Sequence, residues 1–169
     1  MPTRIATSQD AEAIGEIRIA AWKAAYTGCM PASYLATLSS TDNLDQRREF
    51  LANTPNGVKV HVAEKSDIVV GFSIVGQPRY PTNPNAIELW ALNVLPEFWR
   101  TGVGSELIQV SIKSVLKGPY SSMELWCIKG NMAAELAYQR NGFSSTHKER
   151  TTSNLTGHPL HEVLYSKML

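Results

Sequence analysis

The chain has 169 residues, of which 43% are hydrophobic and 18% charged, and its formal net charge at pH 7 is +1. This length is typical of a single domain over residues 1–169, and the share of hydrophobic residues excludes a wholly disordered chain. The balanced charge gives no basic surface for nucleic acid, and no apolar stretch approaches the roughly 20 residues of a membrane span, so neither partner is expected. Two cysteines make no disulfide framework, and the N-terminus lacks the apolar stretch of a signal peptide, so we expect a cytoplasmic protein.

The N-terminal half is predicted to contain one strand, three helices and then two strands. Hydrophobic residues recur at helical spacing from Ile14 to Ala25, and Gly28 ends that helix. Asn56-Gly57 marks a turn before a hairpin, and three prolines predict a loop over residues 77–85. The expected order is strand 3–7, the helix ending at Gly28, short helices 31–38 and 42–53, and strands 58–63 and 68–75.

The C-terminal half alternates strands and helices. Residues 86–95 are almost continuously apolar, which is typical of a strand covered on both faces. A helix led by Gly102 ends near Gly118-Pro119, and a second one is capped by Gly142. The expected order is strand 86–95, helix, strand 123–128, helix 131–141, and an antiparallel pair of strands at 143–151 and 160–168. The order predicts a mixed sheet with helices on its faces, an α/β fold.

The turn between strand 86–95 and the following helix is the most informative segment. Gly102 and Gly104 let the backbone approach a ligand, and the first N–H groups of the helix have no intrahelical partner. An anion is the natural occupant of such a helix start. The same glycines are compatible with a tight turn and close helix packing alone. No Walker motif follows, whereas a dinucleotide fingerprint is disfavoured but stays open, because Glu124 lies 20 residues after Gly104.

A second group of residues lies on the helix at 131–141. Asn131, Ala134 and Tyr138 are spaced so that they share one helix face. Leu136 and Ala137 are expected on the side that faces the core. The face could hold a ligand between a carboxamide and a phenol, and the alternative is that Tyr138 is a packing residue.

These two segments together resemble the GNAT superfamily of acyl-CoA-dependent N-acyltransferases. The turn Gly102-Val103-Gly104 is similar to the family's pyrophosphate-binding turn, and the pattern Asn131, Ala134, Tyr138, Gly142-Phe143 is similar to its later CoA-binding and catalytic helix. Residues 21–35 also resemble one broad, poorly characterised bacterial-type branch. The turn differs from the common family pattern at Trp99, where Arg or Gln is usual, and at Arg100, where a further glycine is common.

The resemblance implies a fold, a donor and a set of binding residues. The sheet would be mixed, mostly antiparallel and of about seven strands, with helices on both faces and a splay between strands 86–95 and 123–128. Acetyl-CoA would be the acyl donor and a small primary amine the acceptor, with no metal; a homodimer is an expectation drawn from the family alone. The residues expected to bind CoA are Leu92, Val94, Arg100, Thr101, Gly102, Val103, Gly104, Ser105 and Asn131.

The resemblance also implies catalytic roles. Tyr138 is the candidate general acid for the leaving thiolate. Glu88 lies within an apolar strand, so it is either paired with a basic side chain or acts as the base. Cys127 could form an acyl-enzyme, although a buried, inert thiol is the favoured interpretation. Trp22, Tyr26, Tyr34 and Trp90 are candidates for the acceptor pocket, with core packing as the alternative for each.

The sequence therefore predicts an N-acetyltransferase that transfers an acetyl group directly to an amine. Two other functions stay open at this point. One is a catalytically weak acyl-CoA-binding regulatory module on the same fold, and the other is a nucleotide-binding oxidoreductase.

Overall fold

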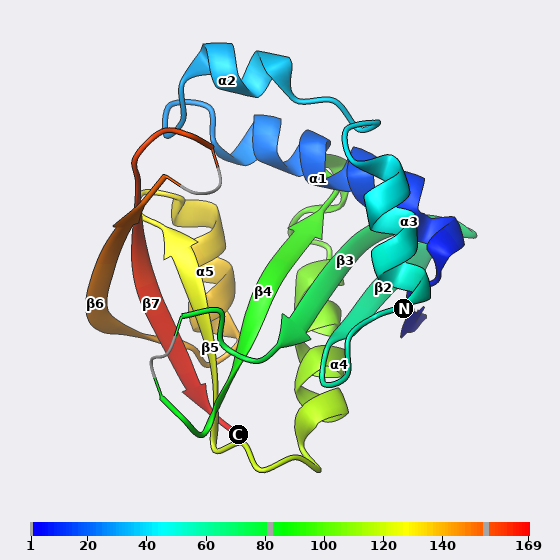
Figure 1. The fold of residues 1–169 in the computed structure, drawn as a ribbon. Helices are drawn as coiled ribbons and strands as arrows, with labels where there is room; N and C mark the ends of the chain where they lie inside the picture. Colours follow the sequence, from blue (N-terminus) through cyan, green and yellow to red (C-terminus); the bar gives the residue numbers. More distant parts are fainter. Residues whose placement is uncertain (1, 81–82, 154–155) are drawn as a thin grey trace.

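The computed structural model describes residues 2–80, 83–153 and 156–169 and forms an α/β fold built on one seven-stranded sheet (Figure 1). The strand order is β1-β2-β3-β4-β5-β7-β6, and among the described pairs only β4 and β5 run parallel. The mixed, mostly antiparallel sheet of the sequence prediction is confirmed. The strands are β1 (Thr3–Ile5), β2 (Lys59–Lys65), β3 (Ile68–Gly76), β4 (Ala86–Val94), β5 (Ser122–Ile128), β6 (Ser144–Thr152) and β7 (Leu160–Met168).

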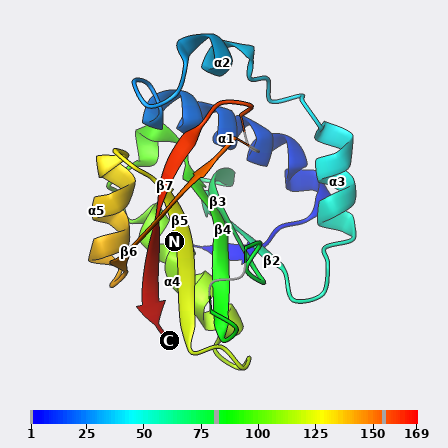
Figure 2. The ribbon, with the colours of Figure 1, turned by 60° about the vertical axis from the view of Figure 1, so that its left-hand side comes forward.

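The helices cover both faces of this sheet, as Figures 1 and 2 show. On one face, α4 packs Ile108 and Ile112 against Leu89 and Leu125 of the two central strands. On the other, α1 packs against the strands of the N-terminal half. The helical segments are η1 (Ser8–Asp10), α1 (Ala11–Ala25), α2 (Ala32–Thr37), α3 (Leu44–Ala52), η2 (Pro96–Phe98), α4 (Val103–Val115) and α5 (Met132–Arg140). None of the described helices is long and apolar enough to cross a membrane.

The two central strands separate along their length. Pairing of β4 with β5 is confined to Ala86–Glu88 against Ser122–Glu124. Beyond Glu88, β4 pairs only with β3, while β5 pairs with β7 along its whole length. The register of β4 with β3 also shifts between Ile74 and Val75, which leaves Trp90 as an extra residue in β4. The splay expected from the family resemblance is therefore present, with its closed end at Glu88.

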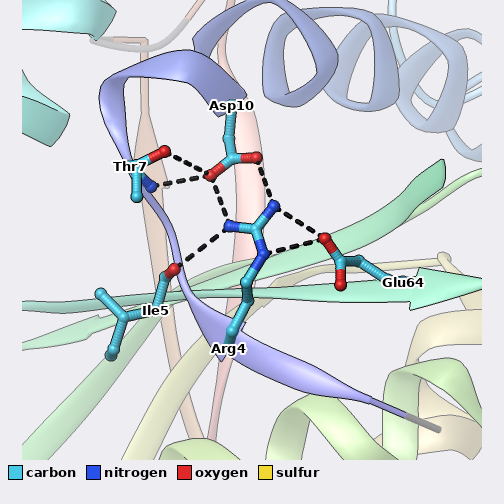
Figure 3. A network of polar contacts seen from close by, with 5 residues as sticks. All are labelled: Arg4, Ile5, Thr7, Asp10 and Glu64. Atoms are coloured by element: carbon cyan, nitrogen blue, oxygen red, sulfur yellow. Dashed lines mark hydrogen bonds and ion pairs between the residues drawn. The ribbon is translucent and has the colours of Figure 1, made fainter. Parts of the chain in front are cut away.

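An ion-pair network fixes the start of the chain to the sheet (Figure 3). The Arg4 guanidinium donates to both carboxylate oxygens of Asp10, at 2.7 and 2.8 Å, and to Glu64 on β2 at 2.8 Å. Asp10 also accepts the Thr7 N–H at 2.7 Å, so the turn into α1 is closed by one carboxylate. The pKa of Asp10 is lowered, chiefly by the hydrogen bonds from Arg4. The network anchors the N-terminal end of α1.

Three details differ from the sequence prediction. On α5, Leu136 is 48% exposed and Ala137 is also exposed, so the prediction that they face the core was wrong. The helix packs through Ala134 and Tyr138 instead. Helix α4 ends at Val115, before Gly118, and α3 has Asn43 rather than Asp42 at its N-cap. Residues 81 and 82 of the predicted loop lie outside the described residues.

Candidate active site

The first turn of α4 lies over the end of β4. The first helical hydrogen bond joins the Glu106 N–H to the Gly102 carbonyl at 3.0 Å, so the N–H groups of residues 103–105 have no intrahelical partner. A Cβ built on Gly104 meets only the Val94 Cγ2 atom, at 4.0 Å. The fold therefore leaves open space beside Gly104 in a helix start with free N–H groups, which is a suitable site for an anion.

The backbone before this helix explains the residue types in the turn. Gly102 has a φ of +94° and Arg100 a φ of +61°, both in the left-handed region. Glycine adopts this region without a steric cost, which accounts for Gly102 and for the family's frequent glycine at the position of Arg100. Arg100, Thr101 and Ser105 are exposed, whereas the Val103 side chain lies in the core and only its backbone could serve a ligand.

The open edge of β4 faces the space between the central strands. The Leu95 N–H donates to Val70 on β3 at 2.9 Å, and successive peptide groups of a strand point to opposite sides. The polar groups of Val94 and Leu92 therefore face β5, with which this part of β4 does not pair. One of them already has a partner, because the Trp99 indole N–H donates to the Val94 carbonyl at 2.7 Å.

Tyr138 lies on the inner face of α5. Its ring packs against Phe143 and Tyr165, with centroids 6.1 and 6.4 Å away. Burial is the main cause that raises its pKa, and nearby Cys127 and Tyr26 raise it further. The phenol is consequently protonated at neutral pH and can act only as a proton donor there. Among the residues that the structure describes, none hydrogen-bonds its hydroxyl group.

Cys127 is buried on β5 and a poor nucleophile. Its thiol donates weakly to the Ile128 carbonyl at 3.6 Å, and burial raises its pKa to about 12. The thiol therefore stays protonated at neutral pH, whereas the thiolate is the reactive form. This agrees with the interpretation of Cys127 as an inert thiol.

The Asn131 side chain connects α5 to the end of α1. Its Oδ1 atom accepts the Ala134 N–H at 3.2 Å and so caps the helix. A hydrogen bond with the same side chain lowers the pKa of Tyr26, although burial raises that pKa by more. The Asn131 side chain therefore contacts both α5 and the residue that follows α1. No spacing or motif in the sequence indicated this pairing.

Glu88 is 2% exposed and forms an ion pair at the closed end of the splay. Oε1 accepts from Nη2 and Nε of Arg79 at 2.7 and 3.0 Å, and Oε2 accepts the Arg79 N–H at 2.8 Å. The structure thus contains the basic partner that was one of the two alternatives for this carboxylate. Arg79, which sequence reasoning did not single out, fixes the loop after β3 onto β4.

The aromatic candidates for an acceptor pocket form two groups. Trp22 and Tyr26 pack edge to face with ring centroids 5.6 Å apart, beside Tyr34 in the cluster under α2. Trp90 lies over Gly76 instead, donates to the Gln77 carbonyl at 2.8 Å and stacks on Arg79. In the described parts of the chain, no ring contact or hydrogen bond joins Trp90 to the first group.

Comparison with known proteins identifies the family. Residues 19–143 match the model of the acetyltransferase (GNAT) family. The chain belongs to the GNAT family. It is 29% identical over 128 residues to the uncharacterized N-acetyltransferase YuaI of Bacillus subtilis (strain 168), an alignment that covers 76% of this chain and 72% of the relative.

Solved GNAT structures share the whole fold. The PaiA N-acetyltransferase of Thermoplasma acidophilum, in complex with coenzyme A, has a TM-score of 0.76 at 18% identity and covers 99% of this chain and 98% of its own. The ribosomal-protein-alanine N-acetyltransferase of Brucella melitensis has a TM-score of 0.76 at 23% identity over all of both chains. YncA of Salmonella typhimurium, described as a putative acetyltransferase with acetyl-CoA, has a TM-score of 0.73 at 20% identity, covering 100% of this chain and 94% of its own.

Other features of the described residues bear on the remaining alternatives. Glu124, the acid that a dinucleotide fingerprint would use, is buried directly opposite Glu88 at the closed end of the splay rather than at the open end of a strand. No group of three or more His, Cys, Asp or Glu side chains is placed to hold a metal ion in the described part of the chain.

Proposed function

We propose that this GNAT protein is an acetyl-CoA-dependent N-acetyltransferase that transfers the acetyl group directly to a small primary amine. The observation that carries the proposal is the first turn of α4, where unpartnered N–H groups and the open space at Gly104 lie over the unpaired edge of β4. Structures of the same fold have been determined with coenzyme A and with acetyl-CoA, which supports this donor.

The residues fit the two polar parts of such a donor. The backbone N–H groups from Thr101 to Ser105 would bind the pyrophosphate, and the exposed side chain of Arg100 would add positive charge. The backbone of Leu92 and Val94 would bind the pantetheine amides as a neighbouring strand would. Because the Asn131 side chain is used by α5 and Tyr26, its contribution to binding would be to hold these elements in place.

The chemistry requires an attack and a proton. The neutral amine nitrogen forms a bond to the thioester carbonyl carbon, the carbon–sulfur bond breaks, and the departing thiolate takes up a proton. Tyr138 is the proposed donor of that proton, since burial keeps its phenol protonated and no described residue forms a hydrogen bond with its hydroxyl group. The proton that the amine loses passes to water or to Glu88, and Tyr138 regains a proton from solvent. The ion pair of Glu88 with Arg79 makes a structural role the competing interpretation.

An acceptor screen tests the proposal. Purified protein is mixed with acetyl-CoA and each of a panel of amines, and release of free CoA thiol and formation of the acetylated amine are both measured. We expect amine-dependent thiol release and saturable binding of CoA but not of NAD. Binding of CoA without transfer to any amine would instead support a regulatory acyl-CoA-binding module, and binding of NAD alone would overturn the proposal.

A further inference from the structure

A cluster of charged and aromatic side chains lies on the sheet face opposite α4 and α5. Glu162 on β7 is paired in register with both Ile128 on β5 and Arg150 on β6, so these three side chains share one face. Trp126, two residues before Ile128, shares it as well. The register of Glu124 with Glu88 extends the same face to the closed end of the β4–β5 splay.

The Arg150 guanidinium lies against two aromatic rings at the centre of this cluster. Its central carbon is 4.0 Å from the ring centroid of Trp126 and 4.3 Å from that of Tyr80, which belongs to the loop after β3. Its Nε atom donates to Glu162 Oε2 at 2.6 Å. Its Nη1 atom is buried and, among the described residues, has no hydrogen-bond partner.

An unpaired donor of this kind is costly. Removing a charged N–H from water without giving it an acceptor costs more than a good hydrogen bond contributes. The N–H bonds of a guanidinium lie in its plane, so an acceptor atom must approach in that plane. Planar oxygen groups, carbonyl or carboxylate, match that geometry.

The surrounding charges favour a neutral oxygen. Glu162 already neutralises the charge of Arg150, and Arg79 neutralises Glu88 on the same face. These two ion pairs leave no net positive charge to attract a second carboxylate, whereas a neutral carbonyl oxygen needs only the Nη1 donor. The site lies beside the point where β4 and β5 separate, which is where the proposed transfer would take place.

We propose that Arg150 is a specificity-determining residue for the acceptor and that it binds a neutral carbonyl oxygen next to the reacting amine, as in an amino-acid amide or the first residue of a peptide. This inference rests on the proposed acetyl transfer. Contacts with Tyr80 and Trp126 restrict the movement of the guanidinium, and the hydrogen bond from Nε to Glu162 fixes its orientation. An amine without the carbonyl group lacks the oxygen that Nη1 requires.

The kinetic test compares matched acceptors in the full-length protein. We measure kcat/KM for glycinamide, ethylamine and glycine with the wild type, with Arg150→Met and with the double variant Arg150→Met/Glu162→Gln. The double variant avoids leaving the Glu162 carboxylate buried without its partner. We expect both variants to lower kcat/KM for glycinamide by about tenfold or more, which is the effect of losing a hydrogen bond to a charged group. For ethylamine we expect kcat/KM to fall by less than about threefold. The variant-to-wild-type ratio for each amine cancels the difference in amine basicity.

Arg48→Met, on α3 at the far side of the molecule, is the control and is expected to change neither ratio (Figure 1). An equal loss for all acceptors would show that Arg150 is only structural and would overturn the inference. A loss confined to glycine would overturn the choice of a neutral oxygen.

A binding test that needs no turnover separates this inference from the proposed function. N-acetylglycinamide is titrated, with and without CoA, while the indole N–H resonance of Trp126, assigned with Trp126→Phe, is followed by NMR. We expect a saturable shift in the wild type that is at least tenfold weaker in Arg150→Met, and no shift with N-ethylacetamide. Failure of CoA binding would contradict the proposed function, whereas an absent or Arg150-independent shift would overturn the inference itself.

Discussion

Gly104 is a glycine that the proposed ligand needs and the fold does not. Its φ lies outside the left-handed region, and a Cβ there would meet only Val94 Cγ2, at 4.0 Å. Because Ala costs less conformational entropy than Gly in a helix, Gly104→Ala should stabilise the protein by about 0.5–1 kcal/mol. For a chain of this size, that corresponds to a rise in Tm of up to about 4 °C.

The same methyl group would add bulk to the α4 first turn, where the pyrophosphate is proposed to bind. We therefore expect Gly104→Ala to weaken CoA binding at least about tenfold, a loss of about 1.4 kcal/mol, and Gly104→Val to weaken it further in a protein that still folds. Stability and affinity thus change in opposite directions. Gly102→Ala is the contrasting variant: its φ of +94° is strained for alanine, so its Tm should fall.

Calorimetry measures both quantities on one sample, with a thermal scan for Tm and a titration with CoA for affinity. Unchanged CoA affinity in Gly104→Ala would refute the assignment of this turn to the pyrophosphate. A lower Tm in the same variant would show that the structure is wrong about the space around Gly104.

Tyr138→Phe should lower turnover at least about tenfold while the CoA Kd moves less than about threefold, since general acid catalysis contributes about 10²–10⁴; equal turnover would make the phenol a packing residue. Glu88→Gln removes the ion pair with Arg79 and should cost about 1–3 kcal/mol of stability in denaturant titrations; a loss of turnover per folded molecule, greatest at low pH, would identify a base instead. Cys127→Ala should keep turnover within about threefold, because an acyl-enzyme would require that thiol. Burial lowers the pKa of His61, so the unfolded chain takes up a proton first and stability should fall as pH drops below about 6.5; His61→Leu should flatten this dependence.

The elements that could be predicted from the sequence are those with a local signal. The apolar run at 86–95 and the glycines after it predict a buried strand followed by a helix start, and the structure has β4 and α4 there. The spacing of Asn131, Ala134 and Tyr138 predicts one helix face, and Ala134 and Tyr138 do pack against the core together. Short-range periodicity is enough for both.

The features that could not be predicted depend on contacts between distant residues. Apolar side chains occur on both sides of α5, so periodicity alone did not show that Met132 and Leu136 face outward, at 63% and 48% exposure. Arg79 meets Glu88 only because the loop after β3 folds back onto β4. Arg150 on β6 meets Trp126 on β5 only because β7, which lies between these strands, pairs with both. No spacing in the sequence encodes these pairs.

The most direct test of the account is to locate the acetyl-CoA site by NMR. Acetyl-CoA is titrated into the ¹⁵N-labelled protein, and the backbone amide resonances are followed. The account predicts that the amides of Thr101–Ser105 and of Leu92 and Val94 shift with one saturation curve, while those of the β2–β3 turn at Ser66 and Asp67 stay unchanged. Saturable binding that leaves the α4 first turn and the β4 edge unshifted, or no binding at all, would contradict it.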